Sequence, residues 1–170
     1  ICTFSGGSQP PKSEFEYQKD ERNIRLIQIR DYKSDKHIVY IPRHRARRFC
    51  DTTDIMIGRY GPPIFQILRG IEGAYNVALM KAIPKKNILK DYLFYFLKNK
   101  KIQNYVIKKS TRAAGQSGVN KESLEPYPIN LPPINTQKEI IRKCKILNKY
   151  ISSLLNLNKS KLDRLNLLRK

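Results

Sequence analysis

Tryptophan is absent from this 170-residue sequence, and cysteine and histidine are scarce. The three cysteines, Cys2, Cys50 and Cys144, lie far apart with no Cys-x-x-Cys pair, which excludes a zinc ribbon and a small disulfide framework. Such cysteine usage is typical of a reducing compartment, so we expect a cytoplasmic protein. No apolar run is long enough to span a membrane, and no signal-peptide pattern opens the chain, so we expect no membrane partner.

Acidic residues are also few. The sequence has 14 Asp and Glu against 34 Lys and Arg, which gives a formal charge of +20 and a pI near 10. A surplus of this size repels itself unless an anionic partner neutralises it, and nucleic acid is the leading class of partner. Hydrophobic residues at 40% supply a core, which argues against wholesale disorder. The length suits one domain with an appendage and excludes a large, self-contained enzyme.

Short β-type runs broken by turn residues fill the chain up to Pro84, and a helical pattern follows. The runs are 24–29, 38–41, 55–57, 64–68 and 75–83. One face of the helical pattern holds Leu89, Leu93, Phe96 and Leu97, continued by Ile102, Tyr105 and Val106. We therefore predict a mixed α/β (α+β) fold, in which one or two helices flank a bent, mostly antiparallel sheet.

A proline-rich strap then leads into a long helix. Thr136-Gln137-Lys138-Glu139 matches a capping box, which predicts that the helix begins there. Apolar residues follow at coiled-coil spacing, and the stripe consists of Ile140, Cys144, Leu147, Ile151, Leu154, Leu162 and Leu165. Asn158 interrupts the stripe and can fix the register of pairing. A helix of about 50 Å cannot bury such a stripe on a small domain, so it needs a partner helix. We divide the chain into a domain, 1–133, and an assembly helix, 134–170.

The densest basic segment is Arg43-His44-Arg45-Ala46-Arg47-Arg48, directly after a predicted strand that ends at Pro42. Arginine suits bidentate contacts with phosphate oxygens and with guanine. We therefore predict that Arg43, Arg45, Arg47 and Arg48 bind nucleic acid. The alternative is a solvated charged turn.

Two further segments carry candidate binding residues. Arg59 and Tyr60 stand at a strand end beside a tight turn, which suits insertion into a groove; alternatively Tyr60 packs and Arg59 is solvated. The polar loop from Gly115 to Lys121 offers backbone amides and side chains to a phosphate. We include Gln116, Ser117 and Lys121 among the predicted DNA-binding residues.

Catalytic and metal motifs are weak. Asp20 followed by Asp31-Tyr32-Lys33 meets a loose nuclease pattern that chance explains. Pro62-Pro63 lacks the flanking amide and aromatic residues of an adenine methyltransferase motif. His37, His44 and Cys50 have no paired-ligand spacing. We predict neither a catalytic residue nor a metal site.

The order of several short motifs resembles one target recognition domain, with its attached helix, of the specificity subunits of type I restriction-modification systems. The motifs are Ser5-Gly6-Gly7-Ser8, Ile24-Arg25-Leu26-Ile27-Gln28-Ile29-Arg30-Asp31, Asp54-Ile55-Met56-Ile57-Gly58-Arg59-Tyr60-Gly61, Gly73-Ala74-Tyr75-Asn76-Val77-Ala78-Leu79, Gly115-Gln116, Val119-Asn120-Lys121, Pro128-Ile129-Asn130-Leu131-Pro132-Pro133, Gln137 and Ile140-Ile141. The sequence departs from the family pattern at Gln9, Phe65 and Thr136.

This resemblance implies a recognition domain that reads half of a duplex DNA site and has no catalytic activity of its own. It implies methyltransferase and restriction subunits as partners, with S-adenosylmethionine, ATP and magnesium held by those subunits. It also implies an antiparallel coiled coil with a second recognition half or a second copy. Two alternatives remain open: the recognition region of a single-chain DNA methyltransferase or restriction enzyme, and a general basic RNA-binding module.

Overall fold

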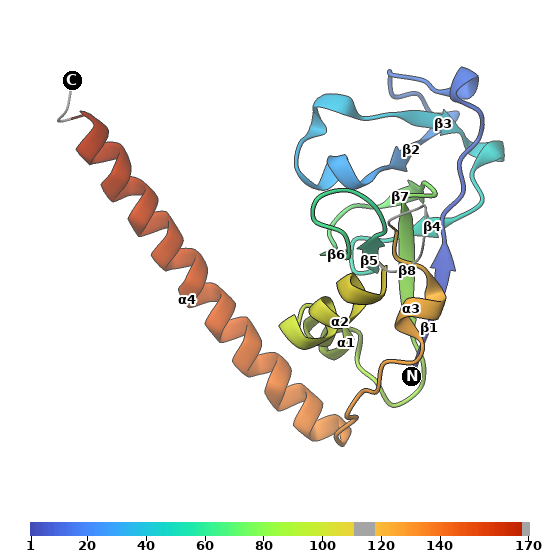
Figure 1. The fold of residues 1–170 in the computed structure, drawn as a ribbon. Coiled ribbons are helices and arrows are strands. Elements are labelled where there is room, and N and C mark those ends of the chain that lie inside the picture. The colour runs from blue at the N-terminus through green and yellow to red at the C-terminus, as the bar shows by residue number, and fades with distance from the viewer. Residues whose placement is uncertain (111–117, 168–170) are drawn as a thin grey trace. The chain divides into compact units, whose positions relative to one another are not determined.

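The computed structural model describes residues 1–110 and 118–167 of the chain. They fall into two compact units, Ile1–Leu131 and Pro132–Lys170, here called unit 1 and unit 2. Unit 1 holds the strands and short helices, and unit 2 is dominated by one long helix (Figure 1). The boundary lies two residues before the division that we predicted.

The larger sheet of unit 1 has the strand order β1-β8-β5-β6, and all three pairings are antiparallel. Its strands are β1 Cys2–Gly6, β5 Ile55–Gly58, β6 Gln66–Leu68 and β8 Leu79–Pro84. Every residue of β5 is buried, because β5 lies between two strands and both of its faces are covered. A continuous apolar run such as Ile55-Met56-Ile57 is typical of a strand in that position.

A second sheet has the order β3-β2-β7-β4 and contains one parallel pairing, between β2 and β7. Its strands are β2 Asn23–Ile27, β3 Tyr40–Pro42, β4 Phe49–Cys50 and β7 Gly73–Tyr75. The mixed α/β class is confirmed, but two sheets replace the single bent sheet that we expected.

The chain leaves one sheet for the other at Asn76, inside the run 75–83 that we predicted as one strand. Asn76 Oδ1 accepts a hydrogen bond of 3.1 Å from the Ala78 amide, and the Asn76 carbonyl oxygen accepts one of 3.0 Å from the Leu79 amide. This turn ends β7 and starts β8. The apolar run 75–83 therefore contributes residues to strands of both sheets.

Three helices cover the larger sheet: α1 Lys90–Leu97, α2 Lys100–Ser110 and α3 Lys121–Leu124. The predicted helical face is confirmed, since Leu93 and Leu97 of α1 and Ile102 and Val106 of α2 are buried together with Phe4 of β1. This cluster is the main core of unit 1, and other members come from β5, β8 and α3. The apolar spacing after Leu89 is thus explained by burial against a sheet.

Four short 3₁₀ helices occupy the connections: η1 Lys12–Glu14, η2 Ile29–Tyr32, η3 Asp35–His37 and η4 Arg43–Arg45. In η2 the Asp31 carboxylate is buried and accepts a hydrogen bond of 3.1 Å from the Gln28 amide. Burial raises the pKa of Asp31, against the opposing effects of that hydrogen bond and of the nearby Arg25. Arg25 also pairs with Asp35 at 2.9 Å, which ties η3 to β2.

Asp54, directly before β5, joins the larger sheet to α1. Its two carboxylate oxygens accept hydrogen bonds of 3.0 Å from Lys81 Nζ and 2.9 Å from Lys90 Nζ. Burial opposes ionisation of Asp54, but the bonds from Lys90, the Asp51 amide and Lys81 outweigh it and lower the pKa of Asp54. The ionised carboxylate therefore stabilises the contact between the sheet and the helix.

Unit 2 consists mainly of α4, Ile134–Leu167, a single helix of 34 residues. It begins before Thr136, so the predicted capping box is wrong. The Gln137 amide donates a hydrogen bond of 3.0 Å to the Pro133 carbonyl oxygen, and Gln137 Nε2 donates one of 2.9 Å to the Pro132 carbonyl oxygen. These bonds place Thr136 inside the first turn. Pro133 is tolerated directly before Ile134, the first residue of α4, because a proline has no amide hydrogen that a helix start would leave unpaired.

Candidate nucleic-acid interface

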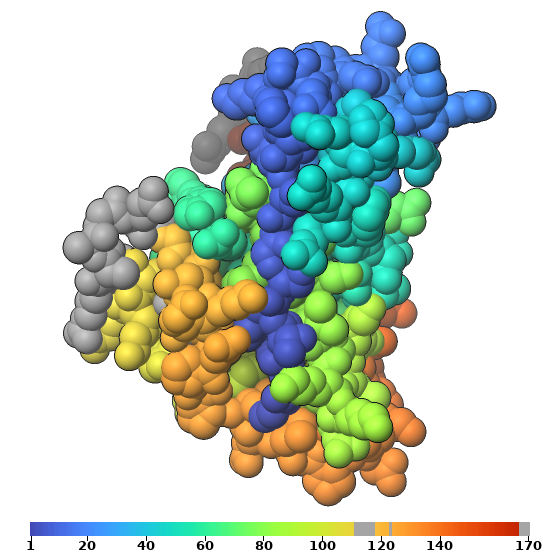
Figure 2. All heavy atoms as spheres, turned by 90° about the vertical axis from the view of Figure 1, so that its right-hand side faces the viewer, coloured from blue at the N-terminus to red at the C-terminus, as the bar shows by residue number. Residues whose placement is uncertain are grey.

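The arginine segment leaves β3 and passes through η4 to β4. Pro42 precedes η4, and the Ala46 amide closes its turn with a hydrogen bond of 3.2 Å to the Arg43 carbonyl oxygen. Residues 40–50, coloured cyan, lie at the surface of unit 1 beside β1 (Figure 2). All four arginines of the segment are exposed, as a role in binding requires.

The four arginines have different partners. Arg45 Nε and Nη2 each donate a hydrogen bond of 2.6 Å to the Glu14 carboxylate, so its guanidinium is already paired. Arg43 Nε donates one of 3.0 Å to the Glu21 carbonyl oxygen. Within residues 1–110 and 118–167, the side chains of Arg47 and Arg48 have no recorded partner. Of the four arginines in this segment, these two are the most available to an external anion.

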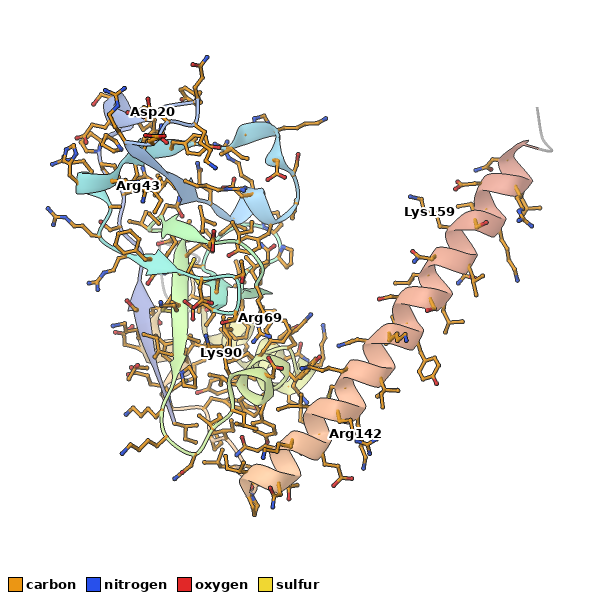
Figure 3. All side chains as sticks on the ribbon, turned by 180° about the vertical axis from the view of Figure 1, so that it is seen from behind. Asp20, Arg43, Arg69, Lys90, Arg142 and Lys159 are labelled. Atoms are coloured by element: carbon orange, nitrogen blue, oxygen red, sulfur yellow. The ribbon has the colours of Figure 1, made fainter. Side chains whose placement is uncertain are left out.

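Acidic groups near Arg43 reduce the net positive charge of this part of the surface. Asp20 accepts hydrogen bonds from Arg22, including one of 3.0 Å from Nη2, and these bonds lower the pKa of Asp20 to about 2. Asp20, Arg22 and Arg43 line the same open hollow together with Lys19 and Glu21. Asp20 and Arg43 both lie at the end of unit 1 that carries β2 and β3 (Figure 3).

Arg59 is bound within the protein. Its Nε donates a hydrogen bond of 2.9 Å to the Val119 carbonyl oxygen, and its Nη1 donates one of 3.1 Å to the Val77 carbonyl oxygen. Its guanidinium carbon also lies 5.1 Å from the ring centroid of Tyr60. Neither of the two alternatives weighed from sequence describes this arrangement, in which Arg59 connects β5 to two distant segments.

Tyr60 is partly exposed, with 36% of its surface accessible. Its ring lies against Gly118, where an added Cβ would come within 2.5 Å of Tyr60 Cε1. Glycine at position 118 therefore permits the close approach of this ring. Lys121 begins α3 and is exposed, whereas Gln116 and Ser117 lie outside the residues that the structure describes.

Sequence reasoning passed over Phe49, the exposed neighbour of the free arginines. The phenyl side chain is 51% exposed, although phenylalanine is usually buried. The signal available in the sequence was its position directly after Arg47-Arg48 and next to Cys50, which is buried. Burial raises the pKa of the Cys50 thiol to about 11, so this thiol is protonated at neutral pH.

Candidate metal and catalytic groups are dispersed. Among the residues described, no group of three or more His, Cys, Asp or Glu side chains could hold a metal ion. His37 and His44 are exposed in different 3₁₀ helices. Asp31 is buried in η2, whereas Asp20 pairs with Arg22 at the surface.

The stripe predicted for the assembly helix is exposed along most of α4. Ile140 and Cys144 are partly buried, Asn158 is exposed, and the exposed apolar members are Leu147, Ile151, Leu154, Leu162 and Leu165. Further exposed apolar side chains flank the stripe at Ile146, Tyr150, Leu155 and Leu157. Within the described chain, no helix is long and apolar enough to cross a membrane.

Comparison with known families adds to this geometry. A family model described as the type I restriction modification DNA specificity domain matches residues 1–167. The specificity subunit of type I restriction enzyme MjaVIII from Methanocaldococcus jannaschii is 32% identical over 107 residues. That match covers 62% of this chain and 24% of the relative, so the chain spans about a quarter of its length.

Two solved structures share the fold. The crystal structure of the HsdS subunit from Thermoanaerobacter tengcongensis matches with a TM-score of 0.67 at 18% identity, covering 91% of this chain and 36% of that chain. A chain from a structure that describes the assembly of a type I restriction-modification system gives the same TM-score and identity, covering 91% and 37%. Because the family model covers nearly all of the sequence, the resemblance drawn from the motifs is confirmed, and the chain belongs to the family of type I restriction-modification DNA specificity domains.

Proposed function

We propose that this chain is the DNA-reading half of a type I restriction-modification specificity subunit, with unit 1 bound to one half of a duplex recognition sequence. The observation that carries the proposal is the pair of free, exposed cations at Arg47 and Arg48, on a chain that belongs to the DNA specificity family. The net charge of +20 supports strong attraction to phosphates.

The proposed roles of the site residues differ with their surroundings. Arg47 and Arg48 bind phosphates or bases, and Arg43 contributes through the part of its guanidinium that the Glu21 carbonyl leaves open. Arg45 holds Glu14 and adds little net charge. Arg59 is a positioning residue that fixes Tyr60 and the segment at Val119. Lys121, at the start of α3, remains a proposed contact, as do Gln116 and Ser117, which lie outside the described residues.

Catalysis, in this proposal, belongs to other subunits. Unit 1 selects the sequence, and methyltransferase and restriction subunits supply the chemistry of S-adenosylmethionine, ATP and magnesium. The matched family and the name of the curated relative support a specificity role. The three cysteines are free thiols, which supports a reducing cytoplasm as the place of assembly.

We propose that α4 pairs with a second recognition half or with a second copy of the chain through its exposed stripe. Burying a row of leucines and isoleucines is favourable, and an apolar patch of this length is unusual on a free monomer. The flanking side chains widen the apolar face, which also supports contact with the methyltransferase subunit.

The alternatives weighed from sequence have weaker support. A single-chain methyltransferase would join a recognition region of this fold to a catalytic domain, but the curated relative named here is a specificity subunit. An RNA-binding module would show weak preference among sequences.

Selection from a pool of randomised 30-base-pair duplexes tests the proposed function. The chain is expected to enrich a short common sequence and to bind it more tightly than a scrambled duplex. The double variant Arg47→Ala, Arg48→Ala should enrich nothing above background, whereas Arg45→Ala should enrich the same sequence as the wild type. Equal binding to all duplexes, or preference for single-stranded RNA, would contradict the proposal.

A further inference from the structure

The side chain of Phe49 leaves the sheet on the side opposite to Cys50. Phe49 and Cys50 are the two residues of β4, and successive side chains of a strand point to opposite faces. Cys50 is packed with Ile27, Met56 and Tyr75 in a buried cluster. Phe49 therefore lies on the opposite face of the sheet, and half of its surface is open.

The cluster that is buried on this face does not enclose the Phe49 ring. Phe49 pairs with Ala74 of β7, and Ala74 packs with Leu26 and Ile41 in a small cluster on that face. Ala74 presents only a methyl group beside the ring, and β4 is the edge strand of the sheet. The ring thus stands at a sheet edge next to a residue too small to cover it.

Cations precede Phe49 in the chain and line the hollow beside it. Arg47 and Arg48 precede it, and both are exposed without a recorded partner in the part of the chain that is described. Phe49 also lines a surface hollow of about 470 Å³ together with Lys19, Arg43 and one exposed carboxylate, Glu72. The surface therefore combines an apolar centre with a mostly positive border.

We propose that Phe49 is a specificity-determining wedge, which enters a groove of the duplex and packs against a base step while Arg47 and Arg48 bind the phosphates on either side. The inference rests on the proposed function and deepens it. Duplex DNA has the complementary chemistry, because its base faces and sugars are apolar and phosphates border them. An aromatic ring that partly unstacks a base step senses sequence, since some steps unstack more readily than others.

The contributions of Phe49 and of the two arginines to DNA binding can therefore be measured separately. The arginines govern how binding depends on salt, because each phosphate contact releases counterions. A neutral ring releases none, so Phe49 contributes to affinity and sequence preference without changing the salt dependence. Loss of a base–aromatic contact is expected to weaken binding about tenfold.

The test uses the duplex enriched by the full-length chain, with 2-aminopurine replacing one adenine at each position in turn. Unstacking increases the fluorescence of 2-aminopurine. The wild type should produce an increase at one step, and Phe49→Ala should abolish it, lower the affinity about tenfold and leave the salt dependence unchanged. Tyr17→Ala is the matched control, because Tyr17 is an exposed aromatic residue without adjacent arginines, and it should behave like the wild type.

Three outcomes are decisive. Loss of the fluorescence increase in Phe49→Ala but not in Tyr17→Ala supports the wedge. Unchanged affinity and fluorescence in a folded Phe49→Ala variant overturn it and leave a protein partner with an acidic border as the occupant of this surface. If the wild type enriches and binds no duplex, the proposed function fails, and that failure is seen in the selection before any variant is compared.

Discussion

Arg59 and Val119, which lie 60 positions apart, exchange two hydrogen bonds. The Val119 amide donates one of 3.0 Å to the Arg59 carbonyl oxygen, and Arg59 Nε donates one of 2.9 Å to the Val119 carbonyl oxygen. The arginine thus satisfies both backbone groups of a buried residue. This contact fastens the end of β5 to the segment that leads into α3.

Replacing Arg59 with lysine should destabilise unit 1, because an ammonium cannot reach the Val119 and Val77 carbonyl oxygens with the same planar geometry. We expect a loss of about 2 kcal/mol in the free energy of unfolding, measured by urea denaturation. Arg48→Lys is the control and should change stability little. Full stability of Arg59→Lys with weakened DNA binding would instead indicate a direct contact with DNA.

The salt dependence of DNA binding should report on Arg47 and Arg48. Removing both with alanine is expected to reduce the slope of log K against log salt by about 2, because two phosphate contacts are lost. Arg45→Ala should leave that slope nearly unchanged, since Glu14 already neutralises this side chain. Fluorescence anisotropy with a labelled duplex at several salt concentrations provides the measurement. If Arg45→Ala reduced the slope as much as the double variant, Arg45 would not differ from Arg47 and Arg48 in its role.

Substitution by alanine should destabilise the fold strongly at Gly7 and hardly at all at Gly6. A Cβ at Gly7 would stand 1.9 Å from the Asn76 carbonyl oxygen, a backbone atom that cannot move without disturbing the turn between the two sheets. Among the described residues other than its two chain neighbours, none has a heavy atom within 4 Å of a Cβ at Gly6. We expect Gly7→Ala to cost about 3 kcal/mol and Gly6→Ala less than about 0.5 kcal/mol. Thermal melts of the two variants, read by circular dichroism, compare them directly.

Protonation of Asp54 in acid should make unit 1 less stable. Its pKa is lowered in the folded protein, so the ionised carboxylate stabilises the fold above the usual carboxyl range, and this contribution disappears as the pH falls through the lowered value. Asp54→Asn should cost roughly 2 kcal/mol at neutral pH, because Lys81 loses its ion pair and Lys90 keeps only the longer pair with Asp51. The difference between the melting temperatures of the two proteins should shrink as the pH falls below the usual carboxyl range. A constant difference would show that the charge of Asp54 is unimportant.

The exposed stripe of α4 should drive self-association of the isolated chain. Analytical ultracentrifugation is expected to show a dimer at micromolar concentrations and a monomer for the double variant Leu147→Glu, Leu154→Glu. Asn156→Glu is the matched control, because position 156 lies on the side of the helix away from the stripe. A wild-type monomer would mean that α4 pairs only with a different chain.

Local sequence patterns predicted α1 and α2 well, whereas α3 was missed. The apolar spacing after Leu89 indicates one face, and burial against one sheet accounts for that face. The division of the run 75–83 could not be predicted in this way, because apolar residues continue through the turn and only the bonds of Asn76 reveal it. The start of α4 was misplaced because Thr136 fits a cap in sequence, whereas the preceding prolines already supply the first carbonyl acceptors.

The sequence predicted which segment carries the candidate site, but not the contacts that its side chains make. The arginine-rich sequence identified residues 43–48, yet the pairing of Arg45 with Glu14 spans 31 positions and has no local signature. The same holds for Arg59 and Val119. The exposure of Phe49 depends on strand pairing, which places Cys50 inward and Phe49 outward. The functional assignment came from the order of motifs along the chain and not from any single one.

The pairing of β1 with β8 has a consequence for synthesis. Among the described strands β1 has one neighbour, and the register joins Cys2 to Pro84. Of the strands of unit 1, β1 is synthesised before the others, yet it finds its partner only after residue 84 has emerged, and closing so long a loop is slow. β5 and β6 are close in sequence and pair antiparallel, so we expect folding to start there. Within unit 1, β1 is then among the last strands to be incorporated, and until then its unpaired edge is open to other nascent chains.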